Sequence, residues 1–287
     1  MPVRPREEGE EVARAPMGDG QYTSPMLRTV DVGGIEVPWC GSGAGAAEAV
    51  VLLPGLGWRA TGSGVLGYLG SGVSAVALDY PRRWPREPLD SMADLGRLYA
   101  AAIERIARAP VRLTGVSMGG MLALQLARDR PDLLASVAIV SASARGRPAG
   151  RWRLPGSRLT TLVLTEGAFH GFYRRWGPAL VGTGYHAAPR EAARLWTDPM
   201  SRRKMRDLLR AVHRFDVRDG LGAIRVPTLV VHGDRDAIFP LARAEEVVAG
   251  IAGASLAVLR GAGHFAFLTH ADAVRERLHQ FWREADR

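Results

Sequence analysis

Short apolar runs alternate with helix-like segments along the chain from residue 49 onward. The runs are rich in Val, Leu and Ala and end at or beside Gly, Pro, Asp or Ser. Strands of a parallel sheet are buried on both faces, so in sequence they are continuous apolar runs rather than alternating patterns. The pattern therefore predicts an α/β fold with a mostly parallel sheet and helices on both of its faces. The predicted strands are AVVLLP (49–54), VSAVALDY (73–80), VRLTGVS (111–117), LASVAIVSA (134–142), VPTLVVHG (226–233) and ASLAVLRG (254–261).

Two further segments extend this predicted sheet and cover it. The sequence LRTVDVGGIEVPWCGSG (27–43) holds two β-like runs around Gly33–Gly34, which predicts an antiparallel hairpin at the sheet edge. Apolar residues recur at helical spacing over 92–106, after a candidate N-cap at Asp90 or Ser91. We expect an amphipathic helix over 92–106, lying on the sheet.

The regular spacing of predicted strands breaks between Ala142 and Arg225, which are about 80 residues apart. The intervening stretch begins with many Gly and Pro residues, is rich in aromatic residues and contains a helix-like piece, MSRRKMRDLLRAVHRF (200–215). An insertion into the α/β unit is the simplest explanation. We therefore predict a disordered tail (1–26), an α/β core (27–144 and 223–287) and a helical cap inserted into that core (145–222).

Composition limits the class of protein. Hydrophobic residues make up 47% and charged residues 23% of the chain, which is ordinary for a soluble globular protein. No stretch approaches 18 uninterrupted apolar residues, and the first 26 residues have no apolar core of a secretory signal. Cys40 is the sole cysteine, so an internal disulfide is impossible and a cysteine-based metal site is not expected. We expect a cytoplasmic protein without a cofactor or metal.

The charge is concentrated in the predicted cap. The chain has a formal net charge of +9, and Lys204 is its only lysine. Residues 145–222 hold 15 arginines and Lys204 against six acidic residues, a net charge of +10, so the rest of the chain is nearly neutral. A basic surface can attract phosphates, an acidic protein or an anionic substrate. A solvated helix surface without any partner is the alternative explanation.

The strongest chemical signal is the pentapeptide Gly115-Val116-Ser117-Met118-Gly119. It matches the pattern G-x-S-x-G and lies between a predicted strand and the helix-like segment MGGMLALQLARDRP (118–131). In this pattern the nucleophile occupies a strained turn, and the flanking glycines let neighbouring backbone pack closely around it. The sequence therefore predicts Ser117 as a nucleophile, with a purely structural turn as the alternative.

Two residues later in the chain complete the pattern. Asp236 lies in HGDRDAIFP after one predicted strand, and His264 lies in RGAGHF after the last one. In the order Ser117, Asp236, His264 the chain resembles the α/β-hydrolase fold family, over about residues 27–285. The resemblance implies that His264 takes the proton of Ser117 and that Asp236 orients the imidazole. Asp234 follows the same strand, and the family pattern favours a turn-shaping role for it.

The other six histidines lack such a setting, and no pair of them has the spacing of a metal site. They are His170, His186, His213, His232, His270 and His279.

A tetrahedral oxyanion needs two preorganised N–H donors. The resemblance implies the backbone N–H groups of Met118 and Leu56. The matching loop of the family commonly reads His-Gly-x, whereas this chain has Pro54-Gly55-Leu56. Pro54 leaves the Leu56 amide in place but removes a side chain that often steadies the loop.

The residue types also narrow the reaction. A serine nucleophile argues against epoxide hydrolase and haloalkane dehalogenase chemistry, which relatives perform through an aspartate. We expect an acyl-enzyme and a carboxylic ester, thioester or lactone substrate, with cleavage of a C–C bond in a diketone less favoured. Two alternatives stay open: a non-hydrolytic reaction in the same pocket, namely cyclisation, rearrangement or acyl transfer, and a ligand-binding protein without turnover.

The predicted cap supplies candidate substrate contacts, because ligands bind beyond the carboxyl ends of parallel strands. The expected ligand is a small acyl substrate that is either apolar or, given the basic cap, carried on coenzyme A or an acyl carrier protein. No nucleic-acid or membrane partner is expected, and the oligomeric state is open. The pocket candidates, for each of which core packing is the alternative, are Trp58, Phe169, Phe172, Trp176, Trp196 and Phe265.

Overall fold

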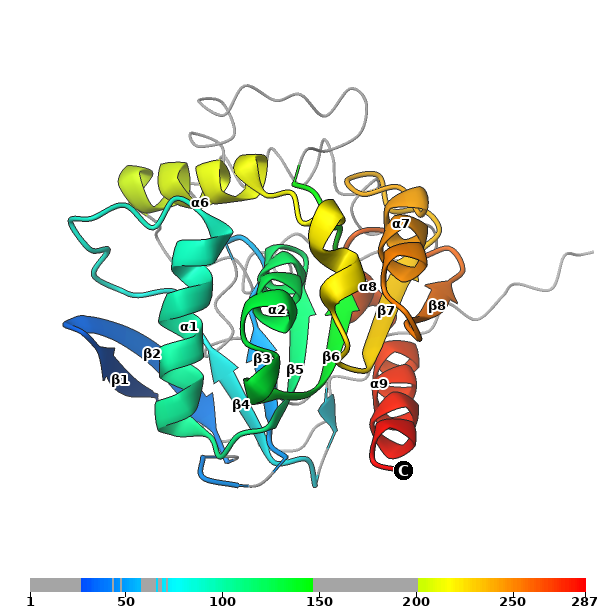
Figure 1. Cartoon of the computed structure of the whole chain (residues 1–287), viewed down its shortest axis with the longest axis horizontal. Helices are drawn as coiled ribbons and strands as arrows, with labels where there is room; N and C mark the ends of the chain where they lie inside the picture. The colour runs from blue at the N-terminus through cyan, green and yellow to red at the C-terminus, as the bar shows by residue number, and fades with distance from the viewer. Residues whose placement is uncertain are drawn as a thin grey trace, which may run out of the picture.

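An eight-stranded sheet forms the centre of the described part of the protein (Figure 1). The computed structural model describes residues 27–42, 44–46, 48–57, 66, 69–70, 72–146 and 201–287. The predicted tail (1–26) and residues 147–200 of the predicted cap lie outside the described residues. The strands are β1 (Arg28–Val32), β2 (Ile35–Gly41), β3 (Val50–Leu53), β4 (Ala75–Leu78), β5 (Val111–Val116), β6 (Leu134–Val140), β7 (Thr228–Gly233) and β8 (Ser255–Leu259).

The strand order is β1-β2-β4-β3-β5-β6-β7-β8. All six apolar runs form strands, and β4, β3, β5, β6, β7 and β8 pair in parallel. The predicted hairpin is also confirmed: β1 pairs antiparallel with β2 at the sheet edge, and β2 pairs antiparallel with β4. Inner strands such as β3 are buried along their whole length, while β8 at the opposite edge exposes Val258. The apolar runs of the inner strands thus correspond to strands covered on both faces, as predicted, whereas the run at β8 is only partly covered.

Helices cover both faces of the sheet, each over its own apolar core. The core on one face includes side chains of α1 and α2, and the core on the other includes side chains of α9. Ser91 is the N-cap of α1, where its hydroxyl accepts from the Asp94 N–H. The helices are α1 (Met92–Ile106), α2 (Met118–Asp129), α6 (Arg202–Arg214), α7 (Ala242–Gly250), α8 (Ala266–Thr269) and α9 (Ala271–Ala285), with short 3₁₀ turns at Pro131–Leu133 and Arg218–Ala223.

Within the predicted cap, the structure describes the helix expected over 200–215 as α6. It lies beyond the ends of the central strands (Figure 1). Met205, Leu208 and Leu209 on its inner face are buried in the core. Among the described residues, no helix combines the length and the apolar character that crossing a membrane requires.

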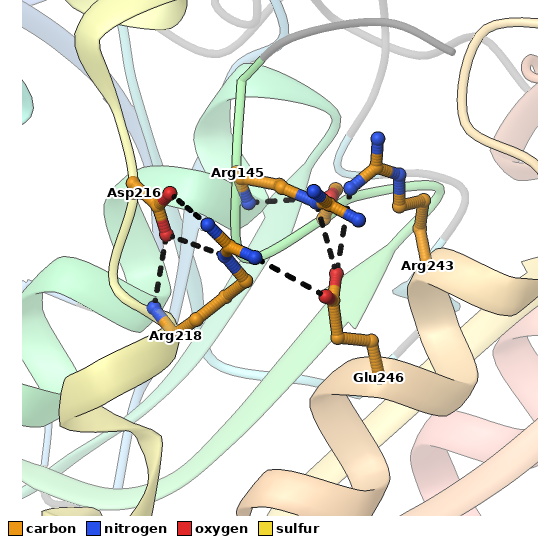
Figure 2. Close-up of polar contacts among 6 residues, drawn as sticks. Arg145, Asp216, Arg218, Arg243 and Glu246 are labelled. Carbon is orange, nitrogen blue, oxygen red and sulfur yellow. Dashed lines mark hydrogen bonds and ion pairs between the residues drawn. The ribbon is translucent and has the colours of Figure 1, made fainter.

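An ionic network links the segment after β6 to the segment after α6 and to α7 (Figure 2). Arg145 and Asp216 form an isolated antiparallel bridge, and Arg218 pairs with Asp216 at 2.7 Å. Glu246 of α7 lies 3.3 Å from Arg145, 3.5 Å from Arg243 and 3.9 Å from Arg218. Because the Asp216 and Arg218 side chains are 44% and 43% exposed, we expect their ion pair to add little to the free energy of unfolding.

Candidate active site

Ser117 occupies the sharp turn between β5 and α2. Its backbone has φ 53° and ψ −115°, a strained conformation for a residue other than glycine. The backbone can pack closely around this turn because the residues two positions before and after Ser117 are glycines. A Cβ added at Gly115 would lie 2.2 Å from the Gly119 carbonyl oxygen, and one added at Gly119 would lie 2.3 Å from the Leu53 carbonyl oxygen. The close backbone packing predicted from the two glycines is therefore present.

His264, in the loop between β8 and α8, lies within hydrogen-bond distance of Ser117. Its Nε2 is 2.9 Å from Ser117 Oγ, and its Nδ1 is 2.9 Å from Asp236 Oδ2. Asp236 follows β7, so the three side chains come from loops at the carboxyl ends of β5, β7 and β8. An ionised carboxylate only accepts hydrogen bonds, so Nδ1 carries the proton and Nε2 is left to accept from the serine hydroxyl. The sequence placed these residues up to 147 positions apart, and the fold brings them together.

The surroundings of Asp236 keep its carboxylate charged. Its Oδ1 accepts hydrogen bonds from the backbone N–H groups of Ile238 and Phe239 at 2.8 and 2.9 Å. Burial alone would raise the pKa of this carboxyl, but the electrostatic attraction of His264 and the hydrogen bonds to the carboxylate bring the pKa below its ordinary value of 3.8. Asp236 is therefore an anion at neutral pH, directed at the imidazole.

A second histidine, His232, supports the same loop. It is fully buried in β7, and its Nε2 donates to the Phe239 carbonyl at 2.7 Å and lies 3.4 Å from Asp236 Oδ2. Burial lowers its pKa, so the imidazole is neutral at neutral pH. The sequence predicted no role for His232. The residue lies within a strand run, four positions before Asp236, and that spacing alone does not reveal the contact. Asp234 instead accepts from the Gly261 N–H at 2.7 Å, which fits its expected role in the turn.

The loop Pro54-Gly55-Leu56 after β3 lies against Ser117. A Cβ added at Gly55 would lie 3.3 Å from the Val116 carbonyl oxygen and 3.5 Å from Ser117 Cβ. Met118, whose amide is the other predicted oxyanion donor, is the first residue of α2. Both predicted donors therefore belong to segments that contact or adjoin the serine.

Tyr80 contacts the same loop and was not identified from the sequence. Its hydroxyl donates to the Pro54 carbonyl at 2.9 Å and lies 3.3 Å from the Gly55 carbonyl oxygen. In the sequence Tyr80 is only the last residue of an apolar run, about 25 positions from the loop. No local pattern distinguishes such a residue from ordinary core.

Of the predicted pocket residues, the structure describes Phe265. Its ring is partly buried, with the centroid 6.0 Å from that of His264. Within the described ranges, no group of three His, Cys, Asp or Glu side chains could hold a metal ion. The other five pocket candidates, which lie outside the described residues, are Trp58, Phe169, Phe172, Trp176 and Trp196.

The sheet and the serine at its strand-to-helix turn define an α/β protein of the hydrolase type. Residues 50–277 match the alpha/beta hydrolase family, so the chain belongs to that family. The fold class and the family expected from the sequence are confirmed.

Individual known proteins agree with this assignment. The polyketide synthase ThaQ of Burkholderia thailandensis is 31% identical over 258 residues, which are 84% of this chain but only 12% of that protein. The pimeloyl-(acyl-carrier protein) methyl ester esterase of Neisseria meningitidis serogroup B is 32% identical over 198 residues, 61% of this chain and 70% of the esterase. The crystal structure of the enol-lactonase from Burkholderia xenovorans LB400 superposes with a TM-score of 0.74 at 22% identity, covering 89% of this chain and 100% of the lactonase. The family and its relatives support a hydrolase.

Proposed function

We propose that this protein is a serine hydrolase that cleaves a carboxylic ester, thioester or lactone through an acyl-enzyme on Ser117. The observation that carries the proposal is the unbroken hydrogen-bonded path from Ser117 Oγ through His264 to Asp236, with both distances 2.9 Å. A serine hydroxyl is a weak nucleophile at neutral pH, and this path gives its proton a place to go. The names of the esterase and the lactonase above favour the same substrate classes.

In the acylation step, Ser117 Oγ attacks the acyl carbon while His264 Nε2 takes the hydroxyl proton. The new C–O bond places a negative charge on the former carbonyl oxygen, which the backbone N–H groups of Leu56 and Met118 stabilise. Collapse of this intermediate breaks the bond to the leaving oxygen or sulfur. The leaving group takes the proton from His264, and the acyl group stays on Ser117.

Deacylation repeats the same steps with water. His264 Nε2 accepts a proton from water as the water oxygen attacks the acyl carbon, and the oxyanion forms in the same place. Breaking the bond to Ser117 Oγ releases the acid, and the proton returns from His264 to the serine. Asp236 stays ionised throughout and stabilises the imidazolium at both stages.

Two measurements separate this proposal from its alternatives. A fluorophosphonate probe is expected to label Ser117 of the wild type and not of Ser117→Ala; absence of labelling would favour a binding protein without turnover. Turnover of an ester in ¹⁸O-labelled water is expected to place ¹⁸O in the product acid. Complete turnover without incorporation would point to cyclisation, rearrangement or acyl transfer and would remove the hydrolase proposal.

We further propose that the acyl group is presented on an acidic carrier protein that contacts α6. The arginines on the outer face of α6 recur every three or four residues and so form one stripe along the helix. The described carboxylates that pair with them are Asp90, 3.0 Å from Arg214, and the buried Asp207, 3.3 Å from Arg206. The stripe is formed by Arg203, Arg206, Arg210 and Arg214, whose side chains are well exposed.

The position of α6 relates this stripe to the candidate active site. Lys204, on the inner face of α6, is buried, and its Nζ donates to the Pro81 carbonyl at 3.0 Å. Pro81 directly follows Tyr80, which contacts the loop beside Ser117. A partner bound to the outer face of α6 would therefore lie near the ends of the strands that hold the reacting groups. The esterase named above acts, by its name, on an acyl group carried in this way.

Neutralising the stripe is expected to separate carrier-bound from free substrates. For Arg206→Gln combined with Arg210→Gln, we expect kcat/KM for an acyl carrier protein thioester to fall about tenfold, because steering between opposite charges raises the association rate. For the same acyl group on N-acetylcysteamine we expect no change. Steady-state kinetics at 50 and 500 mM NaCl provide the measurement, and salt should reduce the wild-type rate for the carrier substrate alone.

The matched control is Arg277→Gln combined with Arg283→Gln, two exposed arginines on α9. This variant is expected to behave as the wild type with both substrates. An equal loss with both variants, or no salt dependence with the carrier substrate, would contradict carrier docking on α6 and leave the hydrolase proposal intact.

A further inference from the structure

Tyr80 lies two residues after the end of β4, between the loop at residues 54–56 and the helix α1. It is 3% exposed, and its hydroxyl contacts two consecutive carbonyl oxygens, those of Pro54 at 2.9 Å and Gly55 at 3.3 Å. A phenol has one proton, so the hydroxyl donates mainly to Pro54 and more weakly to Gly55. Both carbonyls belong to the short segment that also contacts Ser117.

The geometry of a peptide bond turns these contacts into a constraint on the neighbouring N–H. In a trans peptide the C=O and N–H groups lie in one plane and point in opposite directions. The Gly55 carbonyl and the Leu56 N–H belong to the same peptide. As long as the Gly55 oxygen is directed at Tyr80, the Leu56 N–H points away from Tyr80.

The geometry points to Tyr80 as a positioning residue that holds the Gly55–Leu56 peptide with its N–H directed at the oxyanion. This inference rests on the proposed function, in which Leu56 donates to the oxyanion. A reversed peptide would direct the Gly55 carbonyl oxygen toward the developing negative charge and would repel it. Tyr80 thus performs the steadying role for which the sequence, with Pro54 in place of the expected histidine, offered no candidate.

Two features keep the hydroxyl in place as a donor. Burial, together with the nearby Asp79 charge, raises the pKa of Tyr80 well above 10, so the phenol stays protonated at any ordinary assay pH. The ring is also held in position. Lys204 Nζ lies 5.6 Å from the Tyr80 ring centroid, a cation–π distance, and the Tyr99 ring packs edge-on with a centroid separation of 6.4 Å.

Tyr99 provides a matched control within the same cluster. It is fully buried, and its hydroxyl also donates to a backbone carbonyl, that of Asp79 at 3.0 Å. That carbonyl does not belong to the loop beside Ser117. Tyr80→Phe and Tyr99→Phe therefore each remove one buried hydroxyl that donates to the backbone. Only Tyr80→Phe releases residues 54–56.

The test compares these variants in single-turnover acylation by a 4-nitrophenyl ester. For Tyr80→Phe we expect the maximal acylation rate to fall at least tenfold, while the half-saturating ester concentration stays within about twofold of wild type. The loss should not exceed that of removing an oxyanion donor completely, which lowers the rate about 10²–10³-fold. The affinity for an alkyl trifluoromethyl ketone, whose adduct with serine carries the oxyanion, should fall by a similar factor. Tyr99→Phe should change none of these values by more than about twofold.

A donor restored at the same place should restore the rate. Tyr80→4-aminophenylalanine keeps the ring and supplies an N–H to the two carbonyls, so its acylation rate should return most of the way to wild type. If Tyr80→Phe fails to fold, Tyr80→4-fluorophenylalanine, which fills the space of the hydroxyl without a proton, takes its place in the comparison.

Three results would overturn the inference: a wild-type acylation rate in Tyr80→Phe, a loss that appears in the half-saturating concentration, or an equal loss in Tyr99→Phe. Failure of the proposed function is a separate result. It would appear as an absence of acyl-Ser117 in the wild type, whereas failure of the Tyr80 inference leaves wild-type acylation unchanged.

Discussion

Ser117→Ala is expected to lower kcat by about 10⁴ to 10⁶-fold on the natural substrate, and His264→Ala by a similar factor. Without the hydroxyl there is no acyl-enzyme, and without the imidazole the hydroxyl proton has no acceptor at 2.9 Å. The two effects should not add, because the two groups act in the same proton transfer. Steady-state kinetics of both single variants and of the double variant provide the measurement.

The fold should survive these changes. The Ser117 hydroxyl does not cap α2, and its contact with His264 is part of the proposed reaction path. Removing the hydroxyl therefore deletes no hydrogen bond that holds the helix in place. Ser136→Ala, at a buried serine within the neighbouring strand β6, is a suitable control and should retain activity. Near-normal turnover by Ser117→Ala, with a thermal unfolding midpoint like that of wild type, would rule out hydrolysis through an acyl-enzyme.

The parallel sheet could be predicted from the sequence because burial on both faces leaves a direct trace in the chain. Runs such as Val50–Leu53 are continuously apolar because side chains on both faces of β3 are buried, two in each of the two cores. The hairpin at Gly33–Gly34 was equally visible, since both glycines adopt positive φ, which most other residues avoid. At most strand ends the observed boundary differs from the predicted one by one or two residues. Hydrogen bonding between strands, rather than hydrophobicity, determines where a strand ends.

The convergence of Ser117, Asp236 and His264 could be predicted because each residue belongs to a local motif with a known place on the sheet. Tyr80 and His232 have no such motif. Each of these side chains bonds to a backbone carbonyl that lies opposite it only after folding. Every residue has a backbone carbonyl, so the residue type at the partner position gives no sign of the contact. For the same reason the sequence counted Lys204 with the basic surface, whereas the structure buries it against Pro81 and Tyr80.

The two aspartates after β7 allow a matched test of the third position. Asp234→Asn replaces a carboxylate that accepts from the Gly261 N–H at 2.7 Å, and the amide oxygen of asparagine can accept the same bond. We expect that variant to retain kcat within about threefold. A large loss in Asp234→Asn, together with a small one in Asp236→Asn, would exchange the roles assigned to the two residues.

Asp236→Asn is expected to lower kcat by about 10⁴-fold, because an asparagine there selects the wrong tautomer of His264. The backbone N–H groups of Ile238 and Phe239 both donate to Oδ1, so they keep the amide oxygen of Asn on that side. The amide NH₂ then faces His264 Nδ1 and makes it an acceptor, which moves the imidazole proton to Nε2. An Nε2–H cannot take the proton of Ser117, although every heavy atom stays in place. The measurement combines kinetics of Asp236→Asn above neutral pH with NMR detection of the proton on His264 Nε2. Full activity of this variant, with the proton on His264 Nδ1, would show that Asp236 does not set the tautomer.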